Sequence, residues 1–299
     1  MESLYGLISD TLIAMAILRA SITAAGAACA LVSLFAQQPA KPLPPLAKDP
    51  GAFPLGDTQG TGAKQMGPAT PAGPAPHLAD GRPDFGGDGA WYPGFAGNIA
   101  EPQWKGVRSA DKHVDVPFLP WSVDVFNERV RNFAKDDPEA QCLPVGIPRY
   151  MFDPYPFEIV QLDNRIIFVF EGDNHPWRII RMVKDRSQAK HDPNVASTWM
   201  GDGVGWYEGD TLVVDVTGFN DKSWLDQAGH PHTEQMHLTE RYTRTDSMTL
   251  KYEVTIEDPG AYMKPWTTTN TVRWRPGLKL MEYVCYENEK DANHMRGNR

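Results

Sequence analysis

Residues 249–257 alternate between apolar and polar side chains with a period of two. The apolar positions are Leu250, Tyr252, Val254 and Ile256, and the polar positions are Lys251, Glu253, Thr255 and Glu257. Successive side chains of a β-strand point to opposite faces, whereas the side chains of one helical face recur every three or four residues. The pattern therefore predicts a strand with one face in a core and the other in solvent.

Other segments have the same character. Residues 157–171 contain two runs of β-branched and aromatic side chains separated by Asp163 and Asn164, a pair typical of a hairpin turn. Five more segments are strand-like: 178–182, 211–216, 237–244, 267–274 and 278–286. About eight strands joined by turns rich in Asp, Gly and Pro indicate an all-β, mainly antiparallel fold, either a barrel or a sandwich.

Of these two architectures we expect a closed, lipocalin-like barrel. Closure removes exposed sheet edges, and about eight strands leave an interior that holds one small ligand. The one helical segment is 121–136, in which Val125, Val130 and Phe133 lie near one stripe. We expect this short helix to plug or flank the barrel.

The first residues predict export. Residues 20–36 form an uncharged run of small and apolar side chains after Arg19, as in a secretory signal peptide. Residues 1–36 are therefore interpreted as the signal, with cleavage near Ala36 and with Met15 as an alternative start. A run of this length is short for an uncleaved membrane anchor.

A region rich in proline and glycine follows. These two residue types make up 24 of the 62 positions in 37–98, a composition typical of chain without a packed core. We interpret 37–76 as a disordered linker and 77–299 as a single β-rich domain. Together with the signal, this organisation predicts a periplasmic or secreted bacterial protein.

Two cysteines remain once residues 1–36 are removed, Cys142 and Cys285. An oxidising compartment would allow them to form one long-range disulfide. Two buried free thiols are the alternative, because spacing along the chain does not place two Cα atoms within bridging distance.

The overall charge limits the choice of partners. The formal net charge is -9, so nucleic acid, anionic lipid and, after signal removal, a membrane are not expected as partners. A small neutral or cationic molecule is the expected ligand, and the oligomeric state is left open. The sequence lacks the GxSxG, P-loop, GxGxxG and CxxC motifs, so no nucleotide cofactor is expected.

Several blocks of the sequence resemble one family. They are 142–149, 154–161, 170–180, 199–226, 252–262 and 281–291, with EGDTLVVDVTGF as the most specific stretch. They are similar to a large family of uncharacterised exported proteins of soil and aquatic bacteria, over roughly residues 77–299. The resemblance implies export and a single β-rich domain, and it assigns no catalytic residue.

Residues 229–241 contain three of the eight histidines. On an extended chain His230 and His232 project to the same face, and His237 joins them only if the chain bends. Such a trio, with a carboxylate, would suit a divalent transition metal such as zinc, iron or manganese. The alternative is an exposed turn without a metal.

If 237–244 is a strand, Glu240 shares a face with Leu238 and Tyr242, whereas Arg241 points to the other face. A carboxylate on an apolar face must be paired or have a raised pKa, which is the condition for a general acid or base. A structural Glu–Arg pair inside a barrel is the alternative.

The segment EGDNHPWR, 171–178, joins two apolar strands. We expect Glu171, Asn174 and His175 at one barrel mouth, with Trp177 beside them and Arg178 returning into the wall. Loops on a rigid sheet are usual places for sites. His175 precedes a proline and is expected to be extended, where its imidazole would exchange protons near neutral pH.

These residues favour an exported enzyme of the lyase, isomerase or hydrolase type that acts on a small hydrophobic or aromatic molecule. In this hypothesis His175 and Glu240 transfer protons, Arg241 or Arg178 orients an anionic group, and Glu171, Asn174 and Trp177 bind the ligand. The alternatives are a non-catalytic barrel that sequesters or presents a small apolar ligand, and a structural protein of the cell envelope.

Overall fold

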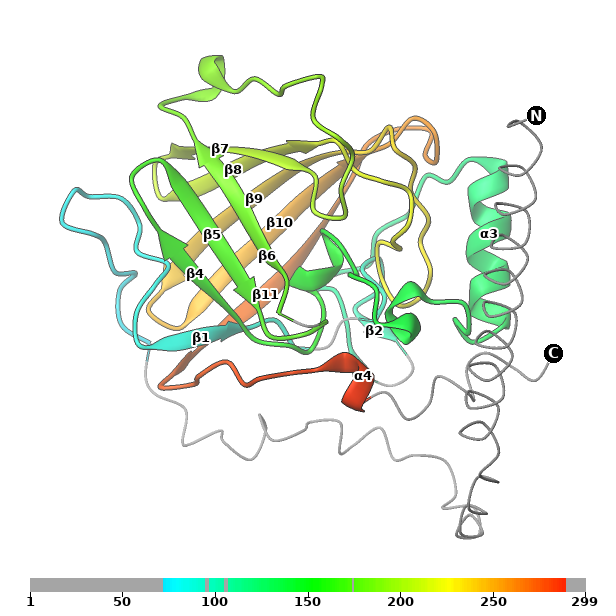
Figure 1. Cartoon of the computed structure of the whole chain (residues 1–299), viewed down its shortest axis with the longest axis horizontal. Helices are drawn as coiled ribbons and strands as arrows, with labels where there is room; N and C mark the ends of the chain where they lie inside the picture. The colour runs from blue at the N-terminus through cyan, green and yellow to red at the C-terminus, as the bar shows by residue number, and fades with distance from the viewer. Residues whose placement is uncertain (1–71, 95–96, 105–106, 174, 289–299) are drawn as a thin grey trace, which may run out of the picture. The chain divides into compact units, whose positions relative to one another are not determined.

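The structure, a computed structural model, is shown in Figure 1. It describes residues 72–94, 97–104, 107–173 and 175–288. The signal peptide and most of the linker expected from the sequence lie outside these residues. Contacts with the sheet begin before the expected domain boundary at residue 77, because the backbone N–H of Gly73 donates to Ser247 Oγ at 2.8 Å.

Nine strands form a closed barrel in the order β1-β11-β10-β9-β8-β7-β6-β5-β4. They are β1 (Gly89–Tyr92), β4 (Phe157–Gln161), β5 (Arg165–Phe170), β6 (Trp177–Met182), β7 (Asp202–Glu208), β8 (Thr211–Thr217), β9 (His237–Asp246), β10 (Thr249–Glu257) and β11 (Trp266–Pro276). A separate two-stranded sheet consists of β2 (Gln103–Trp104) and β3 (Val107–Arg108). The prediction of an all-β, mainly antiparallel fold is confirmed, and the barrel is the architecture that forms.

The barrel closes where β1 pairs with β4 through Trp91 and Phe157. All neighbouring strands are antiparallel except β6 and β7, which are parallel. Antiparallel neighbours can be joined by a short turn, but a parallel pair needs a long connection. Here the chain from 183 to 201 makes that connection and contains a short 3-10 helix, η3 (Arg186–Gln188).

The predicted alternation in β9 and β10 is confirmed, because buried and less buried side chains alternate along both strands. The predicted hairpin also forms, with β4 and β5 on either side of Asp163 and Asn164. Strand β7 was not predicted because glycines interrupt its pattern. The sheet needs one of them: a Cβ on Gly205 would lie 2.8 Å from Cγ2 of Ile180.

The strand predicted at 278–286 is wrong. Residues 278–284 run without a strand partner, and the chain then enters a four-residue helix, α4 (Cys285–Asn288). In Figure 1 this red segment follows β11 and passes the end of the barrel near β1. The apolar run reads like a strand locally, but β1 occupies the open side of β11.

The predicted helix forms as α3 (Pro120–Arg131) and lies outside the barrel (Figure 1). Its expected apolar stripe is wrong, because Val130 and Phe133 are exposed. The helix packs instead through Phe126, which contacts Phe118 and His230 with ring centroids 5.3 and 4.3 Å away. Helix α3 therefore flanks the barrel.

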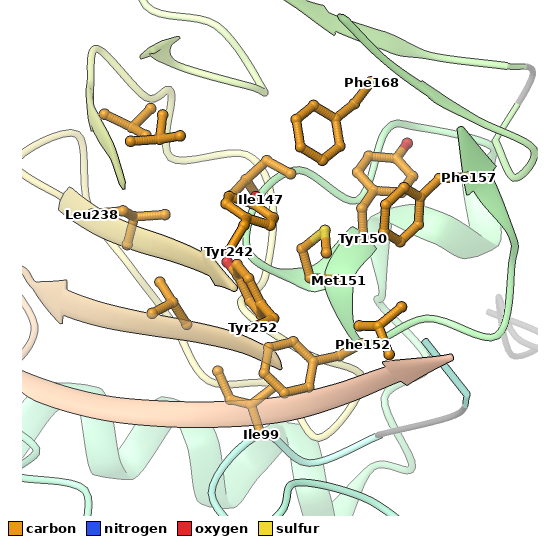
Figure 2. Close-up of a cluster of buried hydrophobic side chains, with 14 of the residues drawn as sticks. Ile99, Ile147, Tyr150, Met151, Phe152, Phe157, Phe168, Leu238, Tyr242 and Tyr252 are labelled. Atoms are coloured by element: carbon orange, nitrogen blue, oxygen red, sulfur yellow. The ribbon is translucent and has the colours of Figure 1, made fainter. Parts of the chain in front are cut away.

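The barrel interior contains part of its own chain. Residues 145–152, including the 3-10 helix η2 (Arg149–Met151), enter the interior. Figure 2 shows Ile147, Tyr150 and Met151 among the rings of the wall strands. The side chain of Asn270 on β11 donates to Met151 O at 2.7 Å. This segment takes up space in the interior that the sequence suggests for a ligand.

Candidate acid–base site at the barrel mouth

The loop of residues 171–176 joins β5 to β6 at one end of the barrel, as the sequence predicts. Backbone hydrogen bonds fix its ends: Phe170 N–H donates to Pro176 O and Glu171 N–H donates to Pro156 O, both at 3.0 Å. Glu171 is buried and His175 is half-buried. The loop therefore brings a carboxyl group and an imidazole to the mouth.

Two residues of this loop, Asp173 and His175, have left-handed backbone conformations, with φ of 51° and 55°. The expected extended conformation of His175 is wrong, because a tight turn brings its N–H to 3.2 Å from Gly172 O. Such conformations are uncommon for residues other than glycine and persist only where surrounding contacts maintain them. Backbone strain of this kind is often found at functional sites.

Both functional groups of the loop bind the C-terminal segment 278–284, which we call the cover. The backbone N–H of Met281 donates to Glu171 Oε2 at 2.7 Å. The backbone N–H of Tyr283 donates to His175 Nε2 at 2.8 Å. Because Nε2 accepts this bond, the imidazole is neutral and carries its proton on Nδ1.

Tyr155, just before β4, forms a second side of the mouth. Its ring centroid is 5.3 Å from that of Tyr283, and the two hydroxyls are 3.5 Å apart. Gly172 lies against the Tyr155 ring, where a Cβ would come within 2.7 Å of Cδ2. Burial raises the pKa of Tyr155, so its hydroxyl stays protonated and can donate a hydrogen bond.

Beside the loop lies a buried guanidinium surrounded by carboxyl groups. Arg149 donates to both oxygens of Asp137, each at 2.9 Å, and it also contacts Glu139. Its Nε atom is 3.6 Å from Oδ1 of Asp153. Asp137 and Glu139 are at the start of a further 3-10 helix, η1 (Pro138–Gln141).

The carboxyl groups near Arg149 outnumber it, and this affects their protonation. Burial raises the pKa of Glu139 to about 7, against the opposing effect of Arg149. Burial, together with the charge of Glu139, also raises the pKa of Asp153. The cluster therefore holds protons at pH values where ordinary carboxyl groups are ionised.

This cluster is connected to the loop through Asp173. The Tyr150 hydroxyl donates to Asp173 Oδ2 at 2.9 Å. Burial raises the pKa of Asp173, and the bond from Tyr150 opposes that rise. The mouth thus combines several carboxyl groups of raised pKa, a neutral imidazole and a tyrosine hydroxyl.

The end of the cover is joined covalently to this region. Cys142 and Cys285 form a disulfide, with their Cα atoms 5.6 Å apart. Cys142 directly follows η1, and Cys285 directly follows the cover. Of the two alternatives that the sequence left open for these cysteines, the structure has the disulfide.

Two residues predicted as catalytic lie deep inside the barrel. Arg178 on β6 and Glu240 on β9 form an ion pair, and their side chains are 1% and 0% exposed. Glu240 also accepts bonds from the hydroxyls of Tyr242 and Tyr252, at 2.7 and 2.9 Å. The acceptor sites of Glu240 are thus taken up by the protein itself, which corresponds to the structural alternative considered for this residue.

The other predicted residues at this end are more dispersed. Arg241 lies on the outer face of the barrel, 3.0 Å from Glu208 and away from the loop. Trp177 begins β6 and is 63% exposed, pointing outward. Asn174 lies outside the described residues. Of the predicted residues that are described, Glu171 and His175 are the two that come together with polar groups at the mouth.

The three histidines predicted as metal ligands do not share a site. Each bonds a different side chain: His230 to Asp226 at 2.7 Å, His232 to Ser223 at 2.9 Å and His237 to Asp215 at 2.8 Å. His230 and His232 are buried in the loop before β9, whereas His237 begins that strand on its outer face. No group of three or more His, Cys, Asp or Glu side chains among the described residues is arranged to hold a metal ion.

Several residues of the mouth were not predicted from the sequence. They are Glu139, Arg149, Asp153, Tyr155 and Tyr283. One signal existed, because Cys142 and Cys285 lie close to Glu139 and Tyr283 in sequence, so a disulfide between them implies that these two regions meet.

Comparisons with protein-family models, with curated proteins and with solved structures give no match. In the part of the chain that the structure describes, no helix is both long enough and apolar enough to span a bilayer.

Proposed function

We propose that the protein is an exported enzyme that performs acid–base chemistry on a small molecule at the barrel mouth, in a reaction of the lyase, isomerase or hydrolase type. One observation carries the proposal: a single strained loop carries the carboxyl group of Glu171 and the imidazole of His175, and both groups bind the same short segment of chain, through Met281 and Tyr283. Rigid loops at a sheet end are where catalytic groups are usually placed.

Both groups are suited to proton transfer. Burial raises the pKa of Glu171, while the hydrogen bond from the backbone N–H of Met281 lowers it. A carboxyl group of raised pKa and an imidazole are the side-chain groups that most often act as general acids and bases. Glu171 and His175 are therefore the proposed acid–base pair, and the protonated hydroxyl of Tyr155 is placed to donate to a substrate oxygen.

The surroundings favour a neutral or cationic substrate with an apolar or aromatic part. Tyr155 and Tyr283 offer ring surfaces at the mouth. Arg149 is already paired with Asp137 and Glu139, so its charge is taken up within the protein and does not favour an anionic substrate. The expectation from the sequence that Arg178 or Arg241 orients an anionic group has no support from their positions.

Export is supported by the disulfide between Cys142 and Cys285, because such bonds form and persist mainly in oxidising compartments. The apolar run at 20–36 provides the second argument. N-terminal sequencing of the mature protein tests this part. We expect it to begin near Gln37; an intact N-terminus on protein recovered from the cytoplasm would refute export.

Activity can be tested before a substrate is identified. The purified protein is incubated with a small-molecule extract of its source organism, and the metabolites consumed and formed are identified by mass spectrometry. We expect wild type to convert at least one compound, and His175→Gln and Glu171→Gln to reduce the rate by about a hundredfold or more, which is typical of losing an acid–base group.

His113→Gln and Glu253→Gln are matched controls. His113 is exposed and contacts Glu101 and Asp115, and Glu253 is in the middle of β10, where its ion-pair partner is Lys251. His113→Gln and Glu253→Gln should both keep wild-type activity. If wild type converts nothing but retains a compound through native mass spectrometry, the protein is a binding protein and the enzyme proposal fails.

A further inference from the structure

The proposed acid–base pair is not open to a substrate in this structure. The acceptor atoms Glu171 Oε2 and His175 Nε2 each receive a backbone N–H from the cover, from residues 281 and 283. These donors are two residues apart, so a short extended piece of chain occupies both groups at once. A substrate that uses either atom must first displace the cover.

We propose that the cover, residues 278–284, is a pH-sensitive lid, which keeps Glu171 and His175 engaged at neutral pH and releases them on acidification. The inference rests on the proposed function, because it takes Glu171 and His175 to be the reactive groups. Its geometry can nevertheless be tested without any substrate.

The cover is anchored at both ends. At its start the chain leaves β11 at Pro276 and turns through Gly277, which has a φ of 72° and no atom within 4 Å of its Cβ position. At its end the disulfide fixes Cys285 to Cys142. Seven residues between a glycine turn and a covalent anchor can swing outward without separating from the barrel.

Few apolar contacts oppose such a movement. Lys279, Met281 and Glu282 are exposed, and the other residues of the cover are half-buried. Tyr283 packs on Tyr155, and Lys279 contacts Asp88, which is itself exposed. A segment outside the sheet whose side chains are exposed or half-buried opens at a lower free energy than the strands of the barrel.

Protonation removes one of the two hydrogen bonds directly. A protonated imidazole carries hydrogens on both nitrogens and has no acceptor left, so His175 cannot accept from Tyr283 N–H. The hydrogen bond from Met281 N–H lowers the pKa of Glu171, so this bond is stronger to the carboxylate than to the protonated acid. Protonation of Glu171 therefore weakens the second hydrogen bond. Acid therefore acts on both hydrogen bonds in the same direction.

Titratable and charged groups from several elements lie around these bonds. They are Glu171 and Asp173 on the loop, Tyr155 before β4, Tyr92 on β1, Arg275 on β11, and Lys279, Glu282 and Tyr283 on the cover. Tyr92 and Tyr155 both have raised pKa values because of burial, so they remain protonated throughout the acid range.

The test is residue-resolved amide hydrogen exchange, measured by NMR on the oxidised full chain at about pH 8 and about pH 5 and corrected for intrinsic rates. In wild type we expect protection of Met281 and Tyr283 N–H to fall about tenfold or more at the lower pH, as the loss of a hydrogen bond predicts. Amides of Tyr242 and Tyr252 in the barrel should keep their protection.

His175→Gln supplies an amide oxygen that accepts a hydrogen bond and does not titrate, so Tyr283 should stay protected at both pH values. His113→Gln is the matched control and should behave as wild type. Equal protection at the two pH values in wild type overturns the proposal, and so does an unchanged pH response in His175→Gln.

The wild-type comparison needs no variant, so misfolding of His175→Gln would not leave the question open. In that event Glu171→Gln provides the second variant, with Met281 N–H as its readout: protection should respond less to pH than in wild type. If exchange of the cover depends on pH as expected but the protein converts no compound, the proposed function alone is refuted. If the protein converts a compound but exchange of the cover does not depend on pH, the lid alone is refuted.

Discussion

Arg178 on β6 and Glu240 on β9 face each other inside the barrel, with Nη1 of the arginine 3.1 Å from Oε1 of the glutamate and a second contact between Nη2 and Oε2. Neither side chain reaches solvent. Two tyrosine hydroxyls complete the bonding of the carboxylate. This ion pair thus joins β6 and β9 inside the barrel, and each side chain neutralises the charge of the other.

We predict that Glu240→Gln or Arg178→Met alone destabilises the protein by about 3–5 kcal/mol, because each leaves an unpaired buried charge or disrupts a buried bonding network. The double variant Arg178→Met, Glu240→Leu should cost much less than the sum. Urea unfolding measures both. Arg241→Met, which removes an exposed pair with Glu208, is the control and should cost about 0–1 kcal/mol. Single variants no more costly than this control would contradict the prediction.

The inward position of Glu240 could be predicted from the sequence, because a period of two assigns each residue of a strand to a face. Its partner could not. Arg178 is 62 positions away, and that pairing depends on how the sheet closes. The same limit applies to the mouth: one loop carries Glu171 and His175, which were found, whereas Arg149 and Tyr155 arrive from segments that only the fold brings near.

Two of the predictions made from the sequence are wrong for physical reasons that the structure shows. Residues 278–286 have strand-like composition, but a strand needs a partner with free backbone groups, and β1 already pairs with β11. His175 was expected to be extended because it precedes a proline, but the hydrogen bond from its N–H to Gly172 O closes a turn that imposes a φ of 55°. Pairing elsewhere in the sheet overrides local preference in the first case, and a tight turn overrides it in the second.

Loss of the Cys142–Cys285 disulfide should lower the free energy of unfolding by about 2–5 kcal/mol, because the bond closes a long loop, of sequence separation 143, in the unfolded chain. Denaturation of wild type with and without a phosphine reductant measures the effect. The double variant Cys142→Ala, Cys285→Ala is the control and should be insensitive to reductant. Equal stability of oxidised and reduced wild type would refute a stabilising role for the bond.

Glu139 should make stability depend on pH. Burial raises its pKa from 4.5 to about 7 in the folded state, so between these values the folded protein binds a proton that the unfolded chain has released. Stability therefore falls as pH rises from about 4.5 to about 7. The pKa difference corresponds to about 3 kcal/mol, which we reduce to about 1–2 kcal/mol because the side chain is 25% exposed.

Urea unfolding of wild type and Glu139→Gln across this pH range isolates the contribution, since glutamine does not titrate. The difference between the two proteins should change by the stated amount between about pH 4.5 and about pH 7. Glu158→Gln, on the outer face of β4, should leave the pH profile as in wild type. A constant difference between wild type and Glu139→Gln would show that Glu139 titrates normally.

On the outer face of the barrel, Asp215 lies between two imidazoles, 2.7 Å from His191 Nε2 and 2.8 Å from His237 Nε2. The hydrogen bond to this carboxylate raises the pKa of His237 above 6.5. The interaction stabilises the fold below pH 6.5 and is lost as pH rises through the raised value. Because the His237 side chain is about one-third exposed, we expect less than about 1 kcal/mol.

The corresponding measurement is an NMR titration of the His237 ring in wild type and in Asp215→Asn. The wild-type midpoint should lie above 6.5, and the variant should move it downward, because a neutral amide does not favour the imidazolium. Asp192→Asn is the control, since Asp192 is exposed and its side chain bonds to Asn194. A midpoint that is the same in wild type and Asp215→Asn would mean that another group, with Glu257 the nearest candidate at 3.7 Å from Nδ1, holds the charge of His237.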